Sequence, residues 1–385
     1  MNIIILGASG SIGRQSLDVL KKHKDEFCLK GFSVGKRIRV IPQIIKNFPS
    51  VKHICVMDEK NMISLKKKYP SINFYYGDEG LINLIENSEA EMVVNALVGF
   101  VGLRPSIRSL ELNKKLALAN KESLVVGGEI INDLLDNGHG KLYPIDSEHS
   151  ALLKCLTVDS SNVKKLILTA SGGAFRKLTR DELKNVKAED ALKHPTWKMG
   201  AKITIDCATM VNKCFEIIEA HYLYRYGYNQ IGVILHDESR VHSMVEYKDG
   251  TYRADISKPD MRNPIEYALF ECNTPIKTYV TTDYHLFKNC HFHDFDIKRY
   301  PMVKYAKLVI EKKGTYGTVL NASNEVAVNA FLNDKISFLG IEKIIDRCMK
   351  EHVNIEHPTI DQIVEIDRKT RQKAADLIKK GGKTI

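Results

Sequence analysis

The sequence has a single Trp and no pair of cysteines in a C-x-x-C spacing, although it contains 385 residues and eight cysteines. Eight cysteines spread over this length do not make the dense framework of a disulfide-stabilised domain. The cluster at residues 290–294 contains Cys and His, but no second cluster supplies matching ligands with zinc spacing. We therefore expect free thiols, a linker at 290–294, and a reducing, cytoplasmic environment.

Long apolar segments are also missing. The longest apolar run without a charge, residues 92–103, has twelve residues, whereas a membrane-spanning helix needs about 20. Met1 and Asn2 lead directly into an apolar run, which leaves no room for a signal or transit segment. We therefore expect neither membrane insertion nor export.

Acidic residues are fewer than basic ones, with 47 Asp and Glu against 57 Lys and Arg, which gives a net charge of +10. This excess favours an anionic partner: nucleic acid, a membrane surface or a small anion. Nucleic-acid proteins concentrate basic residues with aromatics between them, whereas here they are scattered. The densest cluster, which we interpret as a solvated helix end, comprises Arg368, Lys369, Arg371, Lys373, Lys379, Lys380 and Lys383. We expect no nucleic-acid partner.

The first 120 residues alternate short apolar runs with helical patterns. Residues 2–6 (NIIIL) form a continuous apolar run, typical of a strand that is buried on both faces. A helical pattern follows at 11–23. Strands that alternate with helices predict β-α-β units and a parallel sheet, and hence an α/β fold. The other strands predicted here are 28–34, 53–57, 73–76, 91–95 and 116–119.

The pattern changes after the predicted strand 141–145. Strand-like stretches, of which 202–206 is one, lie beside a strong helical pattern at 209–224, and Asp249-Gly250 predicts a hairpin. This mixture indicates a central α+β region. From about residue 296 the chain becomes helical again, which predicts a small helical module with helices at 301–312, 324–333, 338–351 and 360–379.

A glycine-rich turn, Gly7-Ala-Ser-Gly10-Ser-Ile-Gly13, links the first strand to the first helix. Glycines allow the backbone to approach a pyrophosphate, and the helix N-terminus offers free N–H groups. This context predicts dinucleotide binding, although a plain glycine-rich turn would have the same sequence. Residues 27–39 contain no acid that could bind a ribose hydroxyl. Gly35-Lys36-Arg37 follows the second strand instead, which favours NADP over NAD unless these are ordinary loop cations.

Carboxylates with possible metal-binding spacing occur in two places. In Asp146-Ser147-Glu148, residues two apart in an extended chain point the same way. Paired carboxylates suit Mg²⁺ or Mn²⁺, although this pattern is usually plain surface. Asn212, Lys213 and Glu216 share one face of a predicted helix. This could be a site or a solvated Lys–Glu pair.

Three further segments could bind an anionic substrate. Ser171-Gly172-Gly173 follows a predicted strand and suits a phosphate, or is a flexible loop. Lys121, in Asn120-Lys121-Glu122, follows the strand 116–119 at the edge where open α/β sheets bind ligands. The only Trp, Trp197, lies in the predicted loop 194–200, where it either covers a ligand or pins the loop to the core.

These motifs together resemble those of the 1-deoxy-D-xylulose 5-phosphate reductoisomerase family. They run through nearly the whole chain in the family's order, which makes the combined resemblance specific. The matching segments are GASGSIG (7–13), ALANKESLVVGG (117–128), PIDSEHSA (144–151), TASGGAFR (169–176), HPTWKMGAKITID (194–206), ATMVNKCFE (208–216) and LNASNEVAVNAF (320–331).

The resemblance implies a homodimeric enzyme that uses NADPH and one divalent ion, Mg²⁺ or Mn²⁺. It would rearrange and reduce the phosphosugar 1-deoxy-D-xylulose 5-phosphate to 2-C-methyl-D-erythritol 4-phosphate, in the non-mevalonate route to isoprenoid precursors. It also implies a Rossmann-like N-terminal domain, a central α+β catalytic domain and a C-terminal helical bundle. The expected boundaries are 1–146 for the NADPH-binding domain, 147–270 for the catalytic domain with a flap near 194–200, 271–296 for a linker, and 297–385 for the helical domain.

The resemblance also assigns roles by position. Asp146, Glu148 and Glu216 match the metal ligands and, with Lys121 and His194, the catalytic set. The cofactor positions are Ser9, Gly10, Ser11, Ile12, Gly35, Lys36, Arg37, Asn120, Glu122 and Gly200. The substrate positions are Lys121, Ser147, Glu148, Ser171, His194, Trp197, Met199, Cys207, Asn212, Lys213 and Glu216, with Trp197 and Met199 in the mobile flap.

The sequence departs from the family pattern at three positions. Cys207 stands where the family usually has a phosphate-binding Ser, and a thiol is a weaker hydrogen-bond donor than a hydroxyl. Thr196 replaces an Asn of the flap. Arg37 replaces an Asn near the 2′-phosphate, which should strengthen the preference for NADP.

Two other functions are compatible with parts of the sequence. A semialdehyde dehydrogenase would use a nucleophilic Cys, for which Cys207 and Cys214 are candidates, but it would not need three carboxylates around a metal. A basic nucleic-acid-binding or regulatory module that kept a nucleotide-binding fold would bind DNA or RNA with a steep salt dependence. Metal-dependent oxidation of NADPH separates the reductoisomerase from both.

Overall fold

The computed structural model describes residues 1–156, 161–193, 195–197, 199–275, 278 and 284–381. The chain contacts divide it into two compact units, which are described separately. Unit 1 comprises residues 1–123, 130–150 and 260–281, and unit 2 comprises residues 124–129, 151–259 and 282–385. Among the described residues, no helix is both long and apolar enough to cross a membrane.

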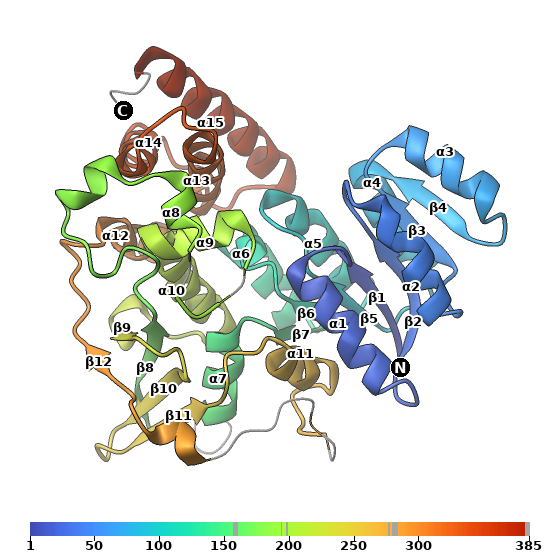
Figure 1. The fold of residues 1–385 in the computed structure, drawn as a ribbon, viewed down its shortest axis with the longest axis horizontal. Coiled ribbons are helices and arrows are strands. Elements are labelled where there is room, and N and C mark those ends of the chain that lie inside the picture. Colours follow the sequence, from blue (N-terminus) through green and yellow to red (C-terminus); the bar gives the residue numbers. More distant parts are fainter. Residues whose placement is uncertain (157–160, 194, 198, 276–277, 279–283, 382–385) are drawn as a thin grey trace. The chain divides into compact units, whose positions relative to one another are not determined.

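Unit 1 is built on a parallel sheet in which the described strands have the order β4-β3-β2-β1-β5-β6-β7 (Figure 1). The central strand β1 pairs with β2 on one side and with β5 on the other, so the strand order reverses at β1. Open α/β sheets bind ligands beyond the carboxyl ends of the strands at such a point. The strands are β1 (Asn2–Leu6), β2 (Cys28–Ser33), β3 (His53–Val56), β4 (Asn73–Tyr76), β5 (Met92–Asn95), β6 (Lys115–Leu118) and β7 (Lys141–Pro144). The parallel α/β fold that the sequence predicted for this region is confirmed.

The core of unit 1 lies on the central strands. Ile3, Ile5, Val94 and Leu29 are buried because helices cover the sheet, which explains why their sequence is continuously apolar rather than alternating. The helices that begin in the first half of the chain are α1 (Ser11–Lys22), α2 (Ile41–Asn47), α3 (Glu59–Lys68), α4 (Gly77–Asn87), α5 (Leu103–Glu111), α6 (Glu122–Asp136) and α7 (Ser147–Leu156).

A late segment of the chain returns to unit 1. Helix α11 (Arg262–Leu269) packs against α1, and Glu266 Oε1 lies 2.6 Å from His23 Nε2. Lys115 and Glu271 form a second link. Residues 260–281 therefore group with the N-terminal unit, whereas the sequence placed them in the catalytic domain and linker. The three-domain boundaries themselves stay a prediction.

Unit 2 contains a mixed sheet in which the described strands have the order β11-β10-β8-β9-β12. Strand β8 pairs with β9 in parallel and with β10 in antiparallel orientation. The hairpin predicted at Asp249-Gly250 is confirmed, since β10 and β11 pair across it and Gly250 has a φ of 86°. The strands are β8 (Val163–Ala170), β9 (Ile231–His236), β10 (Val241–Tyr247), β11 (Tyr252–Ile256) and β12 (Phe292–His293).

Helices make up the rest of unit 2. Helix α13 packs against α14 and α15 near the C-terminus, as the sequence predicted for a helical module (Figure 1). Helix α10 packs against α9 and α12. The helices are α8 (Ala188–Ala191), α9 (Ala201–Thr209), α10 (Val211–Tyr224), α12 (Lys304–Lys312), α13 (Tyr316–Leu332), α14 (Phe338–Lys350) and α15 (Ile360–Gly381).

One predicted strand is wrong. Residues 202–206 (KITID) were expected to be extended, since two Ile and a Thr have high strand propensity. They lie in α9, where Lys202 and Asp206 pair one turn apart and Ile205 is buried. Tertiary burial of one helical face overrides the local propensity.

Candidate active site

The glycine-rich turn of unit 1 lies between β1 and α1, at the carboxyl end of the central strand. Gly7 has a φ of 85°, and a Cβ on Gly13 would lie 2.3 Å from the Gly7 carbonyl oxygen. Only glycine therefore lets α1 begin this close to the strand. Gly10 is the N-cap residue, and no acidic side chain occupies the first turn of α1. The half-buried residues Ser9, Gly10, Ser11 and Ile12 line this turn.

The end of β2 supports the same turn. The Ser33 hydroxyl accepts a hydrogen bond from the Gly7 N–H at 2.8 Å. Beyond it, Gly35, Lys36 and Arg37 are exposed. These two cations therefore follow the strand next to β1, where the sequence placed them, at the carboxyl edge of the sheet.

Asn120 follows β6 and is fully buried. Its amide donates to the carbonyl oxygens of Leu97 and Gly99, at 3.0 and 2.9 Å. Its Oδ1 accepts from the backbone N–H of Ser123 at 3.0 Å, and its Nδ2 lies 3.2 Å from Glu122. The Asn120 side chain therefore holds the loop after β5 and the start of α6.

The next edge position carries an ion pair. Lys121 and Asp146, which follow β6 and β7, are paired, and each side chain is 9% exposed. Parallel pairing of β6 and β7 brings these two positions together at one edge of the sheet. The sequence predicted the edge position of Lys121 but not its pairing with Asp146. The lysine compensates the charge of an aspartate that is largely removed from water.

The carboxylates of Asp146 and Glu148 converge as predicted, since they belong to a group whose ligand atoms lie within 4.8 Å of one another, but the local conformation is not the expected one. The residues were expected to converge because an extended chain alternates its side chains, but helix α7 begins at Ser147, so Glu148 lies in the first helical turn. An acidic residue is favoured there by the helix dipole. The Ser147 hydroxyl donates to Glu148 Oε2 at 2.6 Å.

In unit 2, the Ser171-Gly172-Gly173 segment follows β8. Gly172 and Gly173 have φ values of 81° and 71°, and a Cβ on Gly173 would lie 2.6 Å from the Ala208 Cα. The loop therefore packs directly on the end of α9, which also carries Cys207. The Gly173 N–H donates to the Ser171 hydroxyl at 3.2 Å.

Helix α10 carries the polar triad that the sequence predicted on one helical face. The Asn212 amide donates to Glu216 Oε1 at 2.5 Å, and Lys213 pairs with Glu216 Oε2. Lys213 also donates to the carbonyl oxygen of Thr169, at the end of β8, at 2.5 Å. All three side chains are buried, which excludes the alternative of a solvated Lys–Glu pair. The prediction that these residues gather is confirmed.

The start of this triad depends on a sharp corner between two helices. Met210 ends α9 and begins α10 with a φ of 61°, in the left-handed region. The Thr209 hydroxyl accepts from the Val211 N–H at 3.4 Å and stabilises the corner. Cys207, in the last turn of α9, and Asn212, in the first turn of α10, therefore flank this corner.

The predicted flap is described in part. Trp197 and Met199 are half-buried and Gly200 is the exposed N-cap residue of α9. The Trp197 ring lies 6.2 Å from the His242 ring, and the Thr196 and Ser239 hydroxyls are 3.1 Å apart. The predicted catalytic residue His194 lies outside the described residues.

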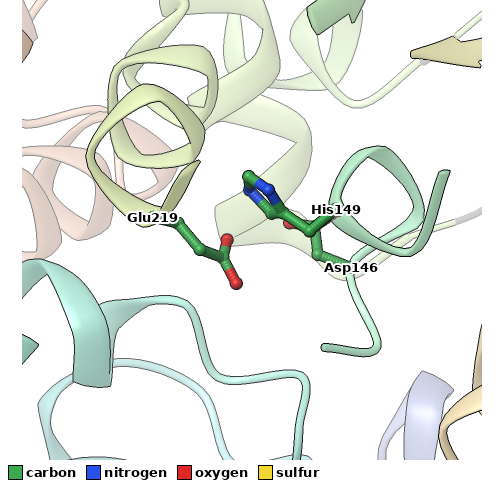
Figure 2. A group of neighbouring side chains, drawn as sticks. All are labelled: Asp146, His149 and Glu219. Atoms are coloured by element: carbon green, nitrogen blue, oxygen red, sulfur yellow. The ribbon is translucent and has the colours of Figure 1, made fainter. Parts of the chain in front are cut away.

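Two buried residues with metal-binding side chains were not selected from the sequence. His149 and Glu219 are 0% and 1% exposed. Figure 2 shows them with Asp146: His149 comes from α7 and Glu219 from α10. Their spacing could have revealed them, because His149 follows Asp146 by three residues and Glu219 follows Glu216 by three.

The surroundings of Cys214 do not suit the nucleophile of the dehydrogenase alternative. Burial raises the pKa of the Cys214 thiol far above its ordinary value, so it remains protonated and unreactive. Cys207 is half-buried and lies in α9.

Profiles of one protein family match three parts of the chain. The 1-deoxy-D-xylulose 5-phosphate reductoisomerase profile matches residues 3–128. The family's two C-terminal domain profiles match residues 142–224 and 256–373. The matches follow the family order from one end of the chain to the other.

Individual relatives agree with these profiles. A 1-deoxy-D-xylulose 5-phosphate reductoisomerase from Bacillus cereus is 44% identical over 379 residues, covering 98% of this chain and 100% of the relative. Its counterpart from Halalkalibacterium halodurans is 43% identical over 381 residues, covering 98% of this chain and 99% of the relative.

Solved structures give the same result. A DOX-P reductoisomerase in complex with NADPH, fosmidomycin and magnesium superposes with a TM-score of 0.92, at 33% identity and 98% coverage of both chains. The enzyme from Zymomonas mobilis in complex with NADPH has a TM-score of 0.89, at 32% identity and the same coverage. The chain therefore belongs to the 1-deoxy-D-xylulose 5-phosphate reductoisomerase family.

Proposed function

We propose that this protein rearranges 1-deoxy-D-xylulose 5-phosphate and reduces the product with NADPH to 2-C-methyl-D-erythritol 4-phosphate, in a reaction that requires one divalent cation. The observation that carries this assignment is the buried triad of Asn212, Lys213 and Glu216 on α10. A structural role alone does not explain a carboxylate, an ammonium and an amide concentrated in one buried helical turn beside the end of β8. Family membership over 98% of the chain supplies the reaction.

NADPH fits the glycine-rich turn of unit 1. Backbone N–H groups at the start of α1 suit a pyrophosphate, and the lack of a Cβ at Gly7 and Gly13 keeps the approach open. Lys36 and Arg37 would bind the 2′-phosphate. Asn120 would act indirectly, because its amide already holds the loop after β5. Glu122 and Gly200 stay proposed cofactor contacts by position.

The carboxylates fit a hard cation. Asp146, Glu148 and Glu216 are one of two combinations of described residues with suitable ligand atoms, and the other is Asp146, His149 and Glu219. We favour the first, because an all-oxygen set suits Mg²⁺ or Mn²⁺. Lys121 pairs with Asp146 and Lys213 pairs with Glu216, so each ammonium compensates part of the charge of these carboxylates.

The phosphate of the substrate would bind in unit 2. Lys213 supplies a buried positive charge, Asn212 an amide, and the Ser171-Gly172-Gly173 loop a hydroxyl and backbone N–H groups. Cys207 lies beside this loop. Phosphate binding is remote from the reacting carbons, so its free energy can be used to close the flap with Trp197 and Met199 and to exclude water. Lys121, Ser147, Glu148 and His194 would contact the sugar.

When bound, the divalent ion would act as a Lewis acid on the substrate oxygens and NADPH would supply the hydride. The protein's own contribution is to orient and to compensate charge. Asn212 and Lys213 fix the two oxygens of Glu216, so this carboxylate is held in one orientation before substrate arrives. Ser147 does the same for Glu148.

The direct test follows the loss of NADPH absorbance with deoxyxylulose phosphate, before and after treatment with a chelator, and after Mg²⁺ or Mn²⁺ is restored. We expect oxidation only with both substrate and metal. Folded protein that oxidises no NADPH under these conditions would refute the proposal. Metal-independent oxidation of a semialdehyde would support the dehydrogenase instead.

We also propose that the enzyme is a cytoplasmic homodimer. Large apolar side chains are exposed in unit 2, among them Tyr284, Phe287 and Ile297, which are 73%, 64% and 47% exposed. Exposed apolar side chains mark a protein interface where they form a contiguous patch. All eight cysteines, each within the described residues, are free thiols, which suits a reducing compartment. Sedimentation or light scattering should give twice the mass of one chain.

A further inference from the structure

A buried carboxylate on α9 has no role in the proposed reaction. Asp206 is 2% exposed. Its Oδ2 accepts from the Lys202 ammonium, one turn earlier on α9, at 2.8 Å. Its Oδ1 accepts from the Asn324 amide of α13, also at 2.8 Å, from a residue 118 positions away in the chain. Asp206 therefore joins α9 to the C-terminal helices.

The orientation of Asn324 is dictated by this contact. A carboxylate can only accept hydrogen bonds, so the amide nitrogen must face Asp206 and the amide oxygen must face away. Within the described part of the chain, that buried oxygen has no hydrogen-bond partner. A buried oxygen without a hydrogen-bond partner is unfavourable. In the described structure, the Asn324 amide therefore bonds to Asp206 through its nitrogen while its oxygen has no hydrogen-bond partner.

Lys202, the other partner of Asp206, contacts a third helix. The Lys202 ammonium lies 5.4 Å from the centre of the Phe215 ring on α10. Helix α13 is itself fixed, because Glu325 accepts from Asn321 at 2.9 Å and from Arg371 of α15 at 2.8 Å. Two sets of contacts therefore meet on α13. Glu325 bonds to Arg371 of α15, and the neighbouring Asn324 bonds to Asp206 of α9, whose partner Lys202 reaches the Phe215 ring of α10.

Helix α9 is the element that these contacts restrain. It begins at Ala201, directly after the flap, and its end carries Cys207 and the Met210 corner that leads to Asn212 and Lys213. A shift of α9 would move the base of the flap and the phosphate-binding groups together. A misplacement of about 1 Å can reduce catalysis on the order of 100-fold.

We propose that Asp206 is a positioning residue for the reaction: with Lys202 and Asn324, it fixes α9 so that the flap and the phosphate-binding groups meet the substrate in the productive arrangement. This inference rests on the proposed function. It assigns Asp206 no contact with substrate or cofactor.

The test compares D206N, N324D and the exchanged pair D206N/N324D. N324D sets two carboxylates against each other, whereas the exchanged pair restores one donor facing one carboxylate. We expect kcat/KM to fall about tenfold or more in D206N and further in N324D, with a raised KM for the phosphosugar. The exchanged pair should recover a large part of the loss. The Kd for NADPH should change less than the KM for the phosphosugar, because the proposed cofactor contacts other than Gly200 lie in unit 1.

The matched control is N329D, which makes the same substitution at an exposed position of α13. It should leave kcat and KM unchanged. A purely structural role of Asp206 would lower the Tm and the folded fraction, but the folded enzyme would keep its KM. The proposal is overturned if D206N keeps the wild-type KM and kcat, or if the exchanged pair is no better than N324D.

A second measurement does not depend on activity. The rate at which a thiol reagent modifies Cys207, followed by mass spectrometry of its peptide, should rise in D206N and return towards the wild-type rate in the exchanged pair. If wild-type protein shows no metal-dependent NADPH oxidation, the proposed function fails while this labelling result still decides whether Asp206 fixes α9. An unchanged labelling rate would contradict the positioning role.

Discussion

Lys213 and Glu216 form an ion pair that is buried on both sides, with 3% and 1% of the two side chains exposed. Water stabilises neither charge, so each depends on the other and on the neighbouring Asn212 amide and Thr169 carbonyl oxygen. Such a pair adds little net stability compared with an apolar core. In the proposed function, the pair instead positions the Glu216 carboxylate for a cation and the Lys213 ammonium for a phosphate.

The first prediction separates the two candidate metal sites. E216Q should abolish metal-dependent turnover, because a neutral amide is a poor ligand for Mg²⁺, while the Kd for NADPH stays unchanged. E219Q, the matched substitution one turn later on α10, should keep measurable turnover. Fluorescence titration with Mn²⁺ provides the readout. Loss of ion binding in E219Q but not in E216Q would instead favour Asp146, His149 and Glu219 as the ligands.

The second prediction concerns stability. K213M removes the cation that pairs with Glu216 and should lower the free energy of unfolding by about 3–5 kcal/mol, as expected when a buried ion pair loses one member. The double variant K213M/E216Q should be more stable than K213M, since it removes the orphaned charge. Urea denaturation of the three proteins measures this coupling. Equal stabilities of K213M and the double variant would contradict it.

The third prediction concerns Cys207. C207S should lower the KM for the phosphosugar by about two- to tenfold, because a hydroxyl donates a stronger hydrogen bond than a thiol and one such bond contributes roughly 0.5–1.5 kcal/mol. C28S, at a half-buried cysteine of unit 1, is the control and should leave KM unchanged. A KM that rises in C207S would mean that the thiol is not a phosphate contact.

The fourth prediction concerns cofactor choice. K36M and R37M should each weaken NADPH binding by about two- to fivefold, a modest effect because solvent screens exposed charges. NADH lacks the 2′-phosphate, so its Kd should not change. K60M, at an exposed residue of α3, should alter neither cofactor. Equal losses for NADPH and NADH would argue against the assignment of these residues to the 2′-phosphate.

The fifth prediction concerns acid stability. Burial opposes the ionisation of Glu238, but hydrogen bonds from the His291 side chain and backbone overcome this and lower its pKa to about 2. A carboxyl group with a lowered folded-state pKa stabilises the protein above its unfolded pKa of about 4.5 and loses this contribution as pH falls towards 2.

In E238Q this acid-dependent contribution should disappear, which would lower the unfolding free energy at neutral pH by about 1–2 kcal/mol. The variant and the wild type should then converge as the pH approaches 2. Denaturation curves across this range measure the difference. A difference that is constant from pH 7 to pH 2 would show that Glu238 acts through packing rather than through its charge.

Local spacing predicted the features that depend on neighbouring residues. Asn212, Lys213 and Glu216 share a face because a helix repeats every 3.6 residues, and α10 confirms it. The Gly7–Gly13 turn followed from the same kind of reasoning, since only glycine tolerates the approach of α1 to β1. The parallel sheet followed from the alternation of strands and helices.

Local spacing failed where distant contacts decide the conformation. Residues 202–206 have strand propensity but form a helix, because Ile205 is buried and Asp206 bonds to Asn324. The carboxylates of Asp146 and Glu148 do converge, but for another reason than expected, because the chain turns into α7 at Ser147 instead of continuing as a strand. In α9, burial outweighs the intrinsic strand preference of the residues.

The sequence by itself determined the family, the glycine turn and the chemical types of the groups in the candidate site, because these depend on residue identity and on short-range geometry. Only the tertiary structure decided which partner each buried charged side chain meets: Asp146 for Lys121, the Thr169 carbonyl oxygen of β8 for Lys213, and the Asn324 amide for Asp206. The reason is that burial depends on which elements pack against each other, and this is set by contacts between residues far apart in the chain.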